Sequence, residues 1–534
     1  MPTSAPTHDR SRRPWRAVRR LLTVVVLLGL LVPAARAQRP ADIAALDAYF
    51  AAARSAWNVP GFAVAIVKDD SVVLAKGYGV RELGKPDPVD AQTLFAIASN
   101  TKAFTVAALA RLVDEGRLAW DDRVADHLPF LVLYAPYVTR EIEIRDLLSH
   151  RSGLGTYSGD LLWYGTTYGR DEVLRRLRYL PPAGAFRADY GYSNVMFLAA
   201  GQLVPAATGR SWDEYIETEF FAPLGMDRSV TSVDSLPNRT NVATPHGEAT
   251  PHGGRPGQIV TYPWYSWDNV GPAASIISSV AEMAKWIRLQ LHHGTWNGRT
   301  YFSAARSREM WTPQISFRVS AGAEERYPST HFRGYGFGWG LMDYRGRKVM
   351  SHGGAADGMY SRVVLVPEEG LGMVILTNSM TSLPAALSYR ILDAFLGGAE
   401  QDWSAEFLAE DRRGSERWAA RWAQWDRERV PNTTPSLPLE GYTGTFGGEL
   451  YGDATLTLEN GGLVLRLLPA PDMVADLTHW QHDTFTIEWR HAFPWFGRGW
   501  AQFVLDPSGK VVEVKLDVPN EDFWFNELHF ARKE

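Results

Sequence analysis

The sequence predicts an α/β (α+β) protein, with an antiparallel sheet flanked by helices, a helical subdomain beside it, and an all-β barrel or sandwich at the C-terminus. Three observations predict this class. Hairpin patterns stand at both ends of residues 60–376, helical patterns fill the interval between them, and period-two alternation governs residues 439–534. Strands from both ends of one domain pair most simply in a single sheet, which leaves the intervening helices to pack beside it.

Two hairpins define the predicted sheet. The first consists of the short apolar runs 62–67 and 72–75, joined by a polar turn. The second consists of the runs 360–366 and 372–376, again around a turn rich in Pro, Glu and Gly. Between the hairpins, apolar residues recur at helical spacing, for example over residues 281–291. The sheet is therefore expected to combine segments that are far apart in the chain.

The segment that follows the second hairpin changes in character. Residues 400–430 are strongly charged and carry four tryptophans, and prolines follow at positions 431, 435 and 438. This pattern predicts a linking helix followed by a Pro-rich boundary. The expected organisation is a signal peptide over 1–37, a main domain over 38–398, a helical and Pro-rich linker over 399–438, and a small β-barrel domain over 439–534.

The composition of the 534 residues limits the possible function classes. With 45% hydrophobic and 22% charged residues, the chain is a folded protein, long enough for two domains. A net charge of −5 without a basic stripe makes nucleic acid an unexpected partner. The chain has no cysteine, which excludes disulfides, thiolate nucleophiles, cysteine-based zinc sites and a lipidated cysteine.

The first residues have the pattern of an export signal. Six arginines within residues 10–20 precede an apolar stretch over 21–32, and Ala35-Arg36-Ala37 supplies a small-x-small cleavage site before Gln38. Twelve helical residues span about 18 Å, short of the roughly 30 Å of a bilayer core. We therefore expect a cleaved signal peptide and a periplasmic or secreted protein without a stable membrane span. An uncleaved anchor is the alternative, and the choice between general and twin-arginine export stays open.

Ser99 and Lys102 are the first candidates for chemistry. They stand at the predicted start of a helix, after an apolar, strand-like run. Residues three apart lie on the same helical face, one turn from each other. The amine can then accept the hydroxyl proton, while the helix N-terminus favours developing negative charge. A chain of this composition contains about half of one Ser-x-x-Lys by chance, so the motif needs support from elsewhere.

Tyr192 and Asn194 form a second candidate stretch, just before an apolar run that predicts a helix. A nearby lysine ammonium would stabilise a phenolate, so Tyr192 is expected to act as a base. The structural alternative is that Tyr192 packs in the core and Asn194 caps the helix. Taken alone, the motif does not decide between these two interpretations.

A third candidate stretch contains His352, Gly353, Gly354 and Ala355 and precedes a predicted strand. Two glycines let the backbone approach a ligand closely, and an adjacent N–H can stabilise an oxyanion. The alternative is a histidine in a surface turn. His150, at a predicted helix end, is expected to be structural and bound to local backbone.

The order and spacing of these stretches resemble the penicillin-recognising serine hydrolases, which include class C β-lactamases, DD-peptidases, D-aminopeptidases and β-lactamase-like esterases. Ser99-Asn100-Thr101-Lys102 matches their Ser-x-x-Lys motif, Tyr192-Ser193-Asn194 their Tyr-x-Asn motif, and His352-Gly353-Gly354 the position of their Lys-Thr-Gly motif. The resemblance covers about residues 43–396 and implies a β-lactamase-like fold. The tail from Leu439 is similar in pattern to the small β domain often appended to such hydrolases.

The resemblance also implies a role for each residue. Ser99 would be acylated, while Lys102 and Tyr192 would share proton transfer. Asn194 would orient Lys102 and a substrate amide. The N–H groups of Ser99 and Ala355 would form the oxyanion hole. The residues that would bind substrate or contribute to this hole are His352, Gly353, Gly354 and Ala355. The resemblance implies no cofactor and no metal.

His352 replaces the lysine of the usual third motif. A fixed positive charge there would hold a substrate carboxylate, whereas an unperturbed histidine is largely neutral at pH 7. The sequence therefore favours an exported serine hydrolase that forms an acyl-enzyme on Ser99 and hydrolyses a D-amino-acid-containing peptide amide or a small ester. A β-lactamase is the alternative enzyme. A catalytically idle sensor that binds cell-wall peptides is the alternative from another class.

Other enzyme classes lack their motifs in this chain, which has no Gly-x-Ser-x-Gly, no His-Glu-x-x-His and no phosphate-binding Gly-x-x-x-x-Gly-Lys followed by Ser or Thr, since Pro86 follows Lys85. The expected partner is a small-molecule or peptide substrate, and the oligomeric state stays open. Two long loops carry aromatic residues that either form a substrate wall or pack in the core, and these are Tyr157, Trp163, Tyr164, Trp264, Tyr265 and Trp267.

Overall fold

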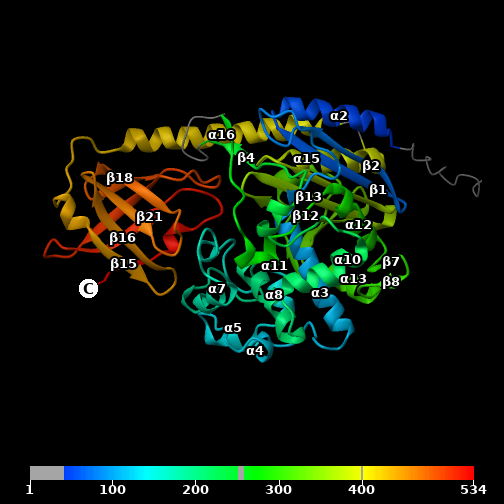
Figure 1. Ribbon diagram of the computed structural model, residues 1–534, viewed down its shortest axis with the longest axis horizontal. Helices are drawn as coiled ribbons and strands as arrows, with labels where there is room; N and C mark the ends of the chain where they lie inside the picture. Colours follow the sequence, from blue (N-terminus) through cyan, green and yellow to red (C-terminus); the bar gives the residue numbers. More distant parts are fainter. Residues whose placement is uncertain (1–40, 250–257, 399–400, 534) are drawn as a thin grey trace, which may run out of the picture.

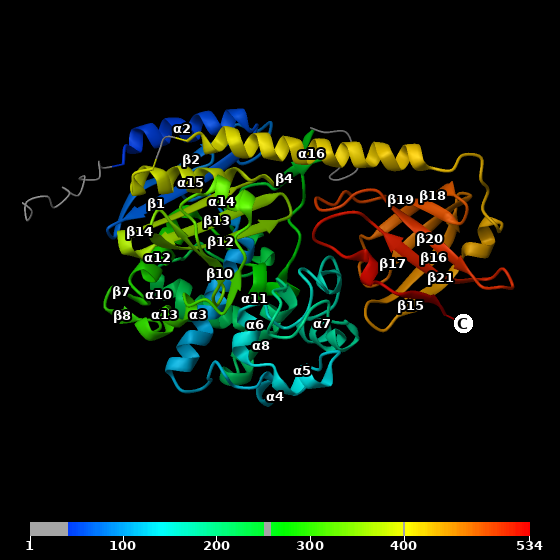
Figure 2. The same ribbon diagram turned by 180° about the vertical axis from the view of Figure 1, so that it is seen from behind.

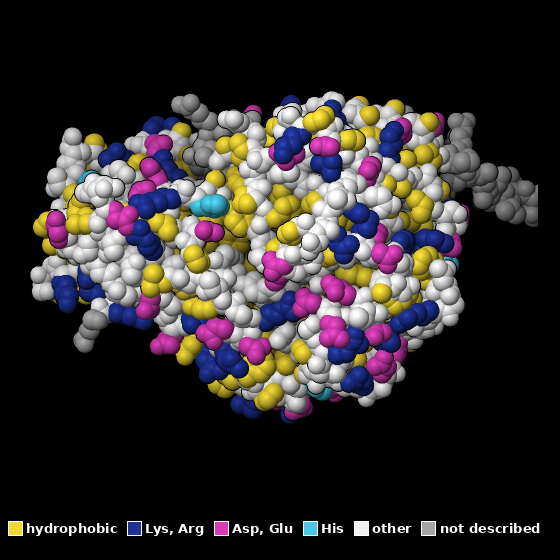
Figure 3. All heavy atoms as spheres, in the orientation of Figure 1, with side chains coloured by type: hydrophobic (Ala, Val, Ile, Leu, Met, Phe, Trp, Pro, Cys, Tyr) yellow, Lys and Arg dark blue, Asp and Glu magenta, His cyan; other side chains and the backbone are white. Residues whose placement is uncertain are grey.

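The computed structural model describes residues 41–249, 258–398 and 401–533, and it shows a large α/β body and a small barrel joined by one long helix (Figure 1). The expected signal peptide over 1–37 lies outside the described residues. Among the helices that are described, none combines the length and the apolar character needed to cross a bilayer. Acidic and basic side chains are interspersed over the face seen in Figure 3.

An eight-stranded antiparallel sheet forms the centre of the large body, in the order β2-β1-β14-β13-β12-β11-β10-β9. The N-terminal hairpin pairs directly with the distant one, since Phe62 lies opposite Thr377 and Lys68 opposite Leu371. This confirms the predicted sheet built from both ends of the domain. The strands are β1 (Gly61–Lys68), β2 (Ser71–Gly79), β9 (Ile315–Phe317), β10 (Arg333–Tyr335), β11 (Gly340–Tyr344), β12 (Arg347–Ala356), β13 (Met359–Val366) and β14 (Leu371–Thr377).

Helices cover both faces of this sheet, which explains why β1 has a continuous apolar sequence. Successive side chains of a strand point to opposite faces. Phe62 and Ile66 therefore join the core under α2 (Ile43–Ala56) and α15 (Leu383–Leu396), whereas Ala63 and Ala65 join the larger core on the side of the helical subdomain. Figures 1 and 2 show α2 and α15 together on one side of the sheet.

The helical subdomain is organised around α3 (Thr101–Asp114), which is buried along most of its length and packs against α8 (Asn194–Thr208) and α11 (Gly271–Ala274). A Cβ at Gly201 would lie 2.1 Å from Pro272 Cγ, so glycine is what lets α8 and α11 meet. The other helices are α4 (Val124–His127), α5 (Pro136–Glu141), α6 (Ile144–Leu148), α7 (Arg170–Arg176), α9 (Trp212–Ile216), α10 (Ala222–Leu224), α12 (Val280–Leu291), α13 (Ala304–Met310) and α14 (Ala321–Arg326).

The linking helix is α16 (Trp403–Glu428), held at both ends by tryptophans. Trp403 is buried and donates from Nε1 to Asp393 at 2.7 Å, while Trp422 packs on Trp500 of the barrel with ring centroids 5.2 Å apart. Figure 1 shows α16 running from above the sheet to the barrel.

The C-terminal domain is a closed barrel of eight antiparallel strands in sequential order, so the predicted all-β domain is a barrel and not a sandwich. Its period-two pattern follows from closure, because each strand points alternate side chains into the interior. The strands are β15 (Gly444–Gly448), β16 (Gly452–Glu459), β17 (Gly462–Leu467), β18 (Val474–Gln481), β19 (Thr484–Trp489), β20 (Gly499–Leu505), β21 (Val511–Asp517) and β22 (Phe530–Arg532).

The barrel is hydrogen-bonded to the loops of the helical subdomain. Tyr168 donates from its hydroxyl to the carbonyl of Tyr451 at 2.6 Å, and Trp524 donates from Nε1 to the carbonyl of Thr156 at 2.7 Å. The Glu527 carboxylate accepts from the N–H of Gly159 at 2.9 Å. These contacts place one end of the barrel over the same loops that surround Ser99.

Candidate active site

Ser99 lies in a tight turn between a short strand, β3 (Phe95–Ala96), and α3. The turn is a single 3₁₀ turn over Ala98–Asn100, and Ala98 adopts a φ of +45°, a conformation that costs energy for a residue other than glycine. Asn100 holds the turn against β13, because its Nδ2 donates to Ser361 Oγ at 2.7 Å. The predicted strand-to-helix setting of the serine is confirmed.

Lys102 points back at Ser99 from the first turn of α3 and is fully buried. Its Nζ lies 3.0 Å from Ser99 Oγ, 2.7 Å from Asn194 Oδ1 and 3.1 Å from the carbonyl oxygen of Ala273. The last two atoms are acceptors only, and a neutral amine has two N–H bonds. Once these are donated to Asn194 and Ala273, the lone pair faces the Ser99 hydroxyl. Burial lowers the Lys102 pKa to about 7, against the attraction of Asp160, so the neutral base is populated near neutral pH.

Asn194 has the position that the resemblance implies, and it does not cap its own helix. The cap of α8 is Ser193, whose Oγ accepts from the N–H of Met196. Asn194 instead bridges Lys102 and a residue that the sequence analysis missed, since its Nδ2 donates to Asp160 Oδ2 at 2.6 Å. Asp160 thereby fixes the amide orientation that presents Oδ1 to the lysine. No local motif identifies Asp160, because it begins a single 3₁₀ turn (Asp160–Leu162) and meets Lys102 and Asn194 only in the folded structure.

Tyr192 lies beside the lysine, with Lys102 Nζ 4.7 Å from the centre of its ring. Burial raises the Tyr192 pKa well above its usual value, although a hydrogen bond with Ser99 opposes this shift. The tyrosine is therefore a neutral hydroxyl at neutral pH. This overturns the prediction of a phenolate base, because burial of the ring outweighs the influence of the neighbouring amine. A neutral Tyr192 can donate and relay a proton, and it is hydrogen-bonded to Ser99.

His352 belongs to a buried chain of hydrogen bonds that also contains His150 and Tyr335. The Nδ1 of His150 accepts from the N–H of Ser193 at 3.0 Å, which leaves its Nε2 to donate to the Tyr335 hydroxyl at 3.2 Å. Tyr335 then donates to His352 Nε2 at 3.0 Å, so the proton of His352 sits on Nδ1, 2.5 Å from the carbonyl oxygen of Gly353. His150 is structural, as predicted, but it reaches beyond the local backbone.

The charge of His352 matches the expectation from the sequence. Burial, together with the charge of Lys102, lowers its pKa to about 3, so the ring is neutral at neutral pH. The third motif therefore supplies a neutral side chain where a lysine would supply a cation.

Gly354 brings β12 against Ser99. A Cβ at this position would lie 2.4 Å from the carbonyl oxygen of Ile97 and 2.8 Å from Ser99 N, so no larger residue fits without displacement. This close approach places Ala355, the next residue of β12, at the edge of the pocket that contains Ser99. The predicted oxyanion pair, the N–H groups of Ser99 and Ala355, stays a prediction.

The predicted residues line one pocket of about 230 Å³. Ser99, Tyr192, Asn194 and the strand over 352–355 all border it, while Lys102 lies buried behind Ser99. Of the six loop aromatics, Tyr157, Trp163 and Trp267 line this pocket, whereas Tyr164, Trp264 and Tyr265 do not. Three further lining residues come from the barrel, and these are Trp495, Asp522 and Phe523.

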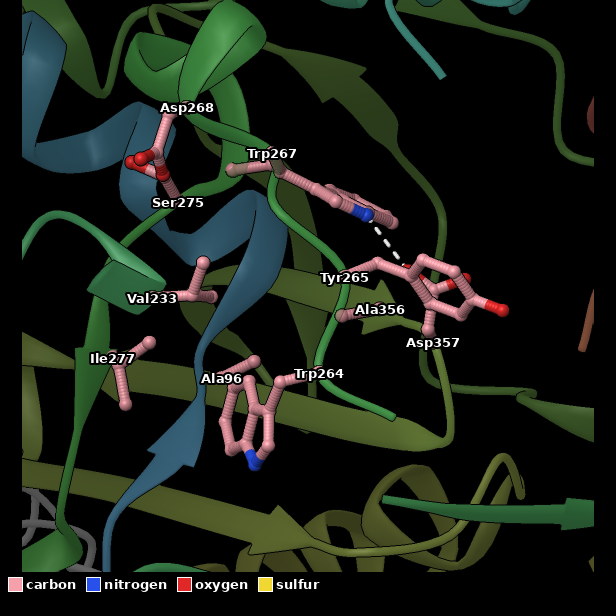
Figure 4. A pocket seen from close by; sticks show the side chains of 11 residues that line it. Ala96, Val233, Trp264, Tyr265, Trp267, Asp268, Ser275, Ile277, Ala356 and Asp357 are labelled. Carbon is pink, nitrogen blue, oxygen red and sulfur yellow. Dashed lines mark hydrogen bonds between the residues drawn. The ribbon is translucent and has the colours of Figure 1, made fainter. Parts of the chain in front are cut away.

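Asp357 connects the barrel to the pocket wall. Its buried carboxylate accepts from the Tyr164 hydroxyl at 2.7 Å and from Nε1 of Trp267 at 2.7 Å. It also accepts from Nε1 of Trp495, in the barrel, at 2.9 Å. Figure 4 shows Trp267 directed at Asp357 beside a small second cavity that also contains Trp264 and Tyr265. The aromatic wall and the barrel are thus fixed to each other through one carboxylate.

Comparison with known families agrees with this geometry. The family described as Beta-lactamase matches residues 46–396, which include all of Ser99, Lys102, Tyr192, Asn194 and His352. The chain belongs to this beta-lactamase family. A domain of unknown function, DUF3471, matches residues 428–532 and so covers the barrel.

Individual relatives support the same assignment. The chain is 28% identical over 431 residues to the unguisins hydrolase ungD of Aspergillus violaceofuscus, which covers 76% of this chain and 74% of the relative. It is 30% identical over 360 residues to penicillin-binding protein 4 of Amycolatopsis lactamdurans, covering 64% of this chain and 86% of the relative. The protein is therefore a serine hydrolase of the superfamily that the resemblance implied.

Solved structures show that the fold extends over both domains. The octameric penicillin-binding protein homologue from Pyrococcus abyssi matches with a TM-score of 0.60 at 20% identity, covering 92% of this chain and all of that one. A D-stereospecific amidohydrolase from Streptomyces sp. matches with a TM-score of 0.52 at 22% identity, covering 67% of this chain and all of that one. At these identities the likeness concerns the fold.

Proposed function

We propose that this protein is an exported hydrolase that forms an acyl-enzyme on Ser99 and cleaves a peptide amide, containing D-amino acids, or a small ester. One observation carries the proposal. The buried Lys102 amine has two obligate acceptors, Asn194 Oδ1 and the Ala273 carbonyl, and its third contact is the Ser99 hydroxyl at 3.0 Å. This is the arrangement that a neutral amine needs to act as a general base.

The reaction then proceeds in two halves. Lys102 takes the Ser99 proton while Oγ bonds to the substrate carbonyl carbon, and the negative charge on the carbonyl oxygen is stabilised by the N–H groups of Ser99 and Ala355. The proton passes through Tyr192 to the leaving amine or alcohol as the C–N or C–O bond breaks. Water next adds to the acyl carbon and gives one proton to Lys102. The bond between the acyl carbon and Ser99 Oγ then breaks, Lys102 returns the proton to Oγ, and the acid leaves with Ser99 and neutral Lys102 restored.

The pocket supports amide or ester substrates over β-lactams. A β-lactam carries a carboxylate, and no Lys or Arg is among the residues that line the described pocket. His352 is neutral there, as its lowered pKa indicates. The name of one relative, a hydrolase of unguisins, supports a hydrolase, whereas the name of the other, a penicillin-binding protein, keeps the β-lactamase as the alternative.

Covalent labelling tests the nucleophile. A fluorophosphonate should add its mass to the wild type and to Ser508→Ala, a control in an exposed barrel turn, but not to Ser99→Ala. Labelling that persists in Ser99→Ala refutes the assignment. Turnover of D- and L-aminoacyl amides, p-nitrophenyl esters and a cephalosporin then identifies the acyl group. Labelling without turnover of any of these substrates would support the idle sensor instead.

Export is a separate part of the proposal and rests on the N-terminal sequence alone. Expression of the full chain in a bacterium with an export pathway should yield a mature protein that begins at Gln38. A protein that keeps residues 1–37 and stays with the membrane fraction would instead indicate an uncleaved anchor.

A further inference from the structure

We propose that Asp522, on a loop of the C-terminal barrel, binds the ammonium group of the substrate in the Ser99 pocket. The barrel would then set substrate specificity and not merely cover the site. This inference rests on the proposed function, since it names the kind of substrate that the Ser99 acyl-enzyme accepts.

The loop that carries Asp522 is held in place from both sides. Within the barrel, the Asn520 side chain closes the loop, as its Oδ1 accepts from the N–H groups of Asp522 at 2.9 Å and Phe523 at 2.6 Å. Its Nδ2 donates to the carbonyl oxygens of Val518 and Phe523. On the other side, Trp524 bonds to the backbone of the helical subdomain. A carboxylate fixed in this way is preorganised for a ligand.

The Asp522 carboxylate has no partner of its own. Among the described residues, no donor hydrogen-bonds to the Asp522 carboxylate and no cation forms an ion pair with it. Burial raises the Asp522 pKa only to about 6. It is therefore ionised near neutral pH. Asp160, the other carboxylate of the pocket, is different, because it already accepts from Asn194 and Trp163. A partly buried and unpaired carboxylate is costly unless a ligand completes it.

The surroundings of Asp522 favour a cation. The described pocket lining contains no Lys or Arg, and it is rich in aromatic rings, to which an ammonium group is attracted. These rings are Tyr157, Trp163, Tyr192, Trp267, Tyr360, Trp495 and Phe523. The neighbouring charge that acts on Asp522 is Glu521, and Asp522 in turn helps to raise the pKa of Tyr157 and of Tyr360, while Arg362 opposes the shift at Tyr360.

The ammonium could come from two sources, a free α-amino group at the N-terminus of a peptide or the side chain of a basic residue. Both present the same chemistry to the carboxylate. Three matched substrates separate them: D-alanyl p-nitroanilide, Nα-acetyl-D-lysyl p-nitroanilide and N-acetyl-D-alanyl p-nitroanilide. The first has only the α-amine, the second only the side-chain amine, and the third has neither.

The test compares the full-length wild type with Asp522→Asn. We expect the wild type to prefer one of the two amine substrates over the acetylated one, and Asp522→Asn to lower kcat/KM for that substrate by about 10- to 100-fold. Activity on the uncharged substrate should stay within about threefold. Glu521→Gln, which removes the same charge one residue away on an exposed side chain, should behave like the wild type.

Other outcomes overturn the inference. An equal loss on charged and uncharged substrates would mean that Asp522 acts on folding or docking, and a wild type without preference for an amine would exclude the ammonium site. Fluorophosphonate labelling of Asp522→Asn at the wild-type rate shows that the nucleophile is intact. If the wild type itself is not labelled at Ser99, the proposed function has failed, independently of Asp522.

Discussion

Replacing Asp160 with asparagine is expected to move the acidic limb of the pH–activity profile to lower pH. Lys102 must be neutral to accept the Ser99 proton, so kcat/KM falls as the pH drops through its pKa of about 7. Burial lowers this pKa, and attraction by the Asp160 carboxylate raises it. Without the carboxylate, the neutral amine persists to lower pH.

The size of the shift follows from the distances. The Asn194 amide lies between the two charged groups. Its Oδ1 is 2.7 Å from Lys102 Nζ, and its Nδ2 is 2.6 Å from Asp160 Oδ2. A charge separation of roughly 7 Å at an effective dielectric constant of 20 corresponds to about 2.4 kcal/mol, or 1.7 pH units. Burial raises the pKa of Asp160 itself to about 8, so its carboxylate carries part of a charge near neutral pH. We therefore expect a shift of about 1 unit.

The assay is kcat/KM for a p-nitrophenyl ester, measured from about pH 5 to 9 for the wild type, Asp160→Asn and Asp121→Asn. Asp121 is exposed, so its variant controls for the loss of one charge. The plateau of Asp160→Asn should fall by about tenfold or less, because an amide cannot accept from both Asn194 and Trp163. An acidic limb that stays in place or moves to higher pH would refute the coupling between Asp160 and Lys102.

Three further substitutions test the site and its support. Gly354→Ala should lower kcat/KM by about 100-fold or more, because its Cβ would lie 2.8 Å from Ser99 N; wild-type kinetics would exclude the close approach. Tyr335→Phe breaks the chain to His352 and should slow fluorophosphonate labelling by about tenfold without unfolding the protein, and unchanged labelling would show that the chain is dispensable. Trp495→Phe removes one donor to Asp357 and should weaken barrel docking by about 1–3 kcal/mol, seen as faster proteolysis of the linker; equal proteolysis would contradict this.

The parts of the fold that local patterns determine were predictable from the sequence. The two hairpins, the linking helix and the period-two strands of the barrel are all read from neighbouring residues. A single sheet built from both hairpins was predictable from strands at both ends of one domain, and the structure adds that β1 pairs with β14. Closure of the barrel was left open because a sandwich and a barrel share the same alternation.

The site was predictable where a motif carries it and not elsewhere. Asp160, Tyr335 and Asp522 carry no motif, and each acquires its role from a residue far away in the chain. The charge of Tyr192 was predicted wrongly, because a pKa depends on burial and burial is a property of the folded structure. By contrast, the neutral charge of His352 was predictable from the sequence, because a histidine stands where the third motif usually has a lysine.

Trapping the acyl-enzyme tests the central claim most directly. The wild type would be mixed with a slowly hydrolysed p-nitrophenyl ester, quenched in acid within the first turnover, digested, and analysed by mass spectrometry. We predict an acyl group on the peptide that contains Ser99, formed with a stoichiometric burst of p-nitrophenol and absent from Lys102→Ala under the same conditions. Turnover of the ester with no acyl group on Ser99, or an acyl group on another residue, would contradict the account.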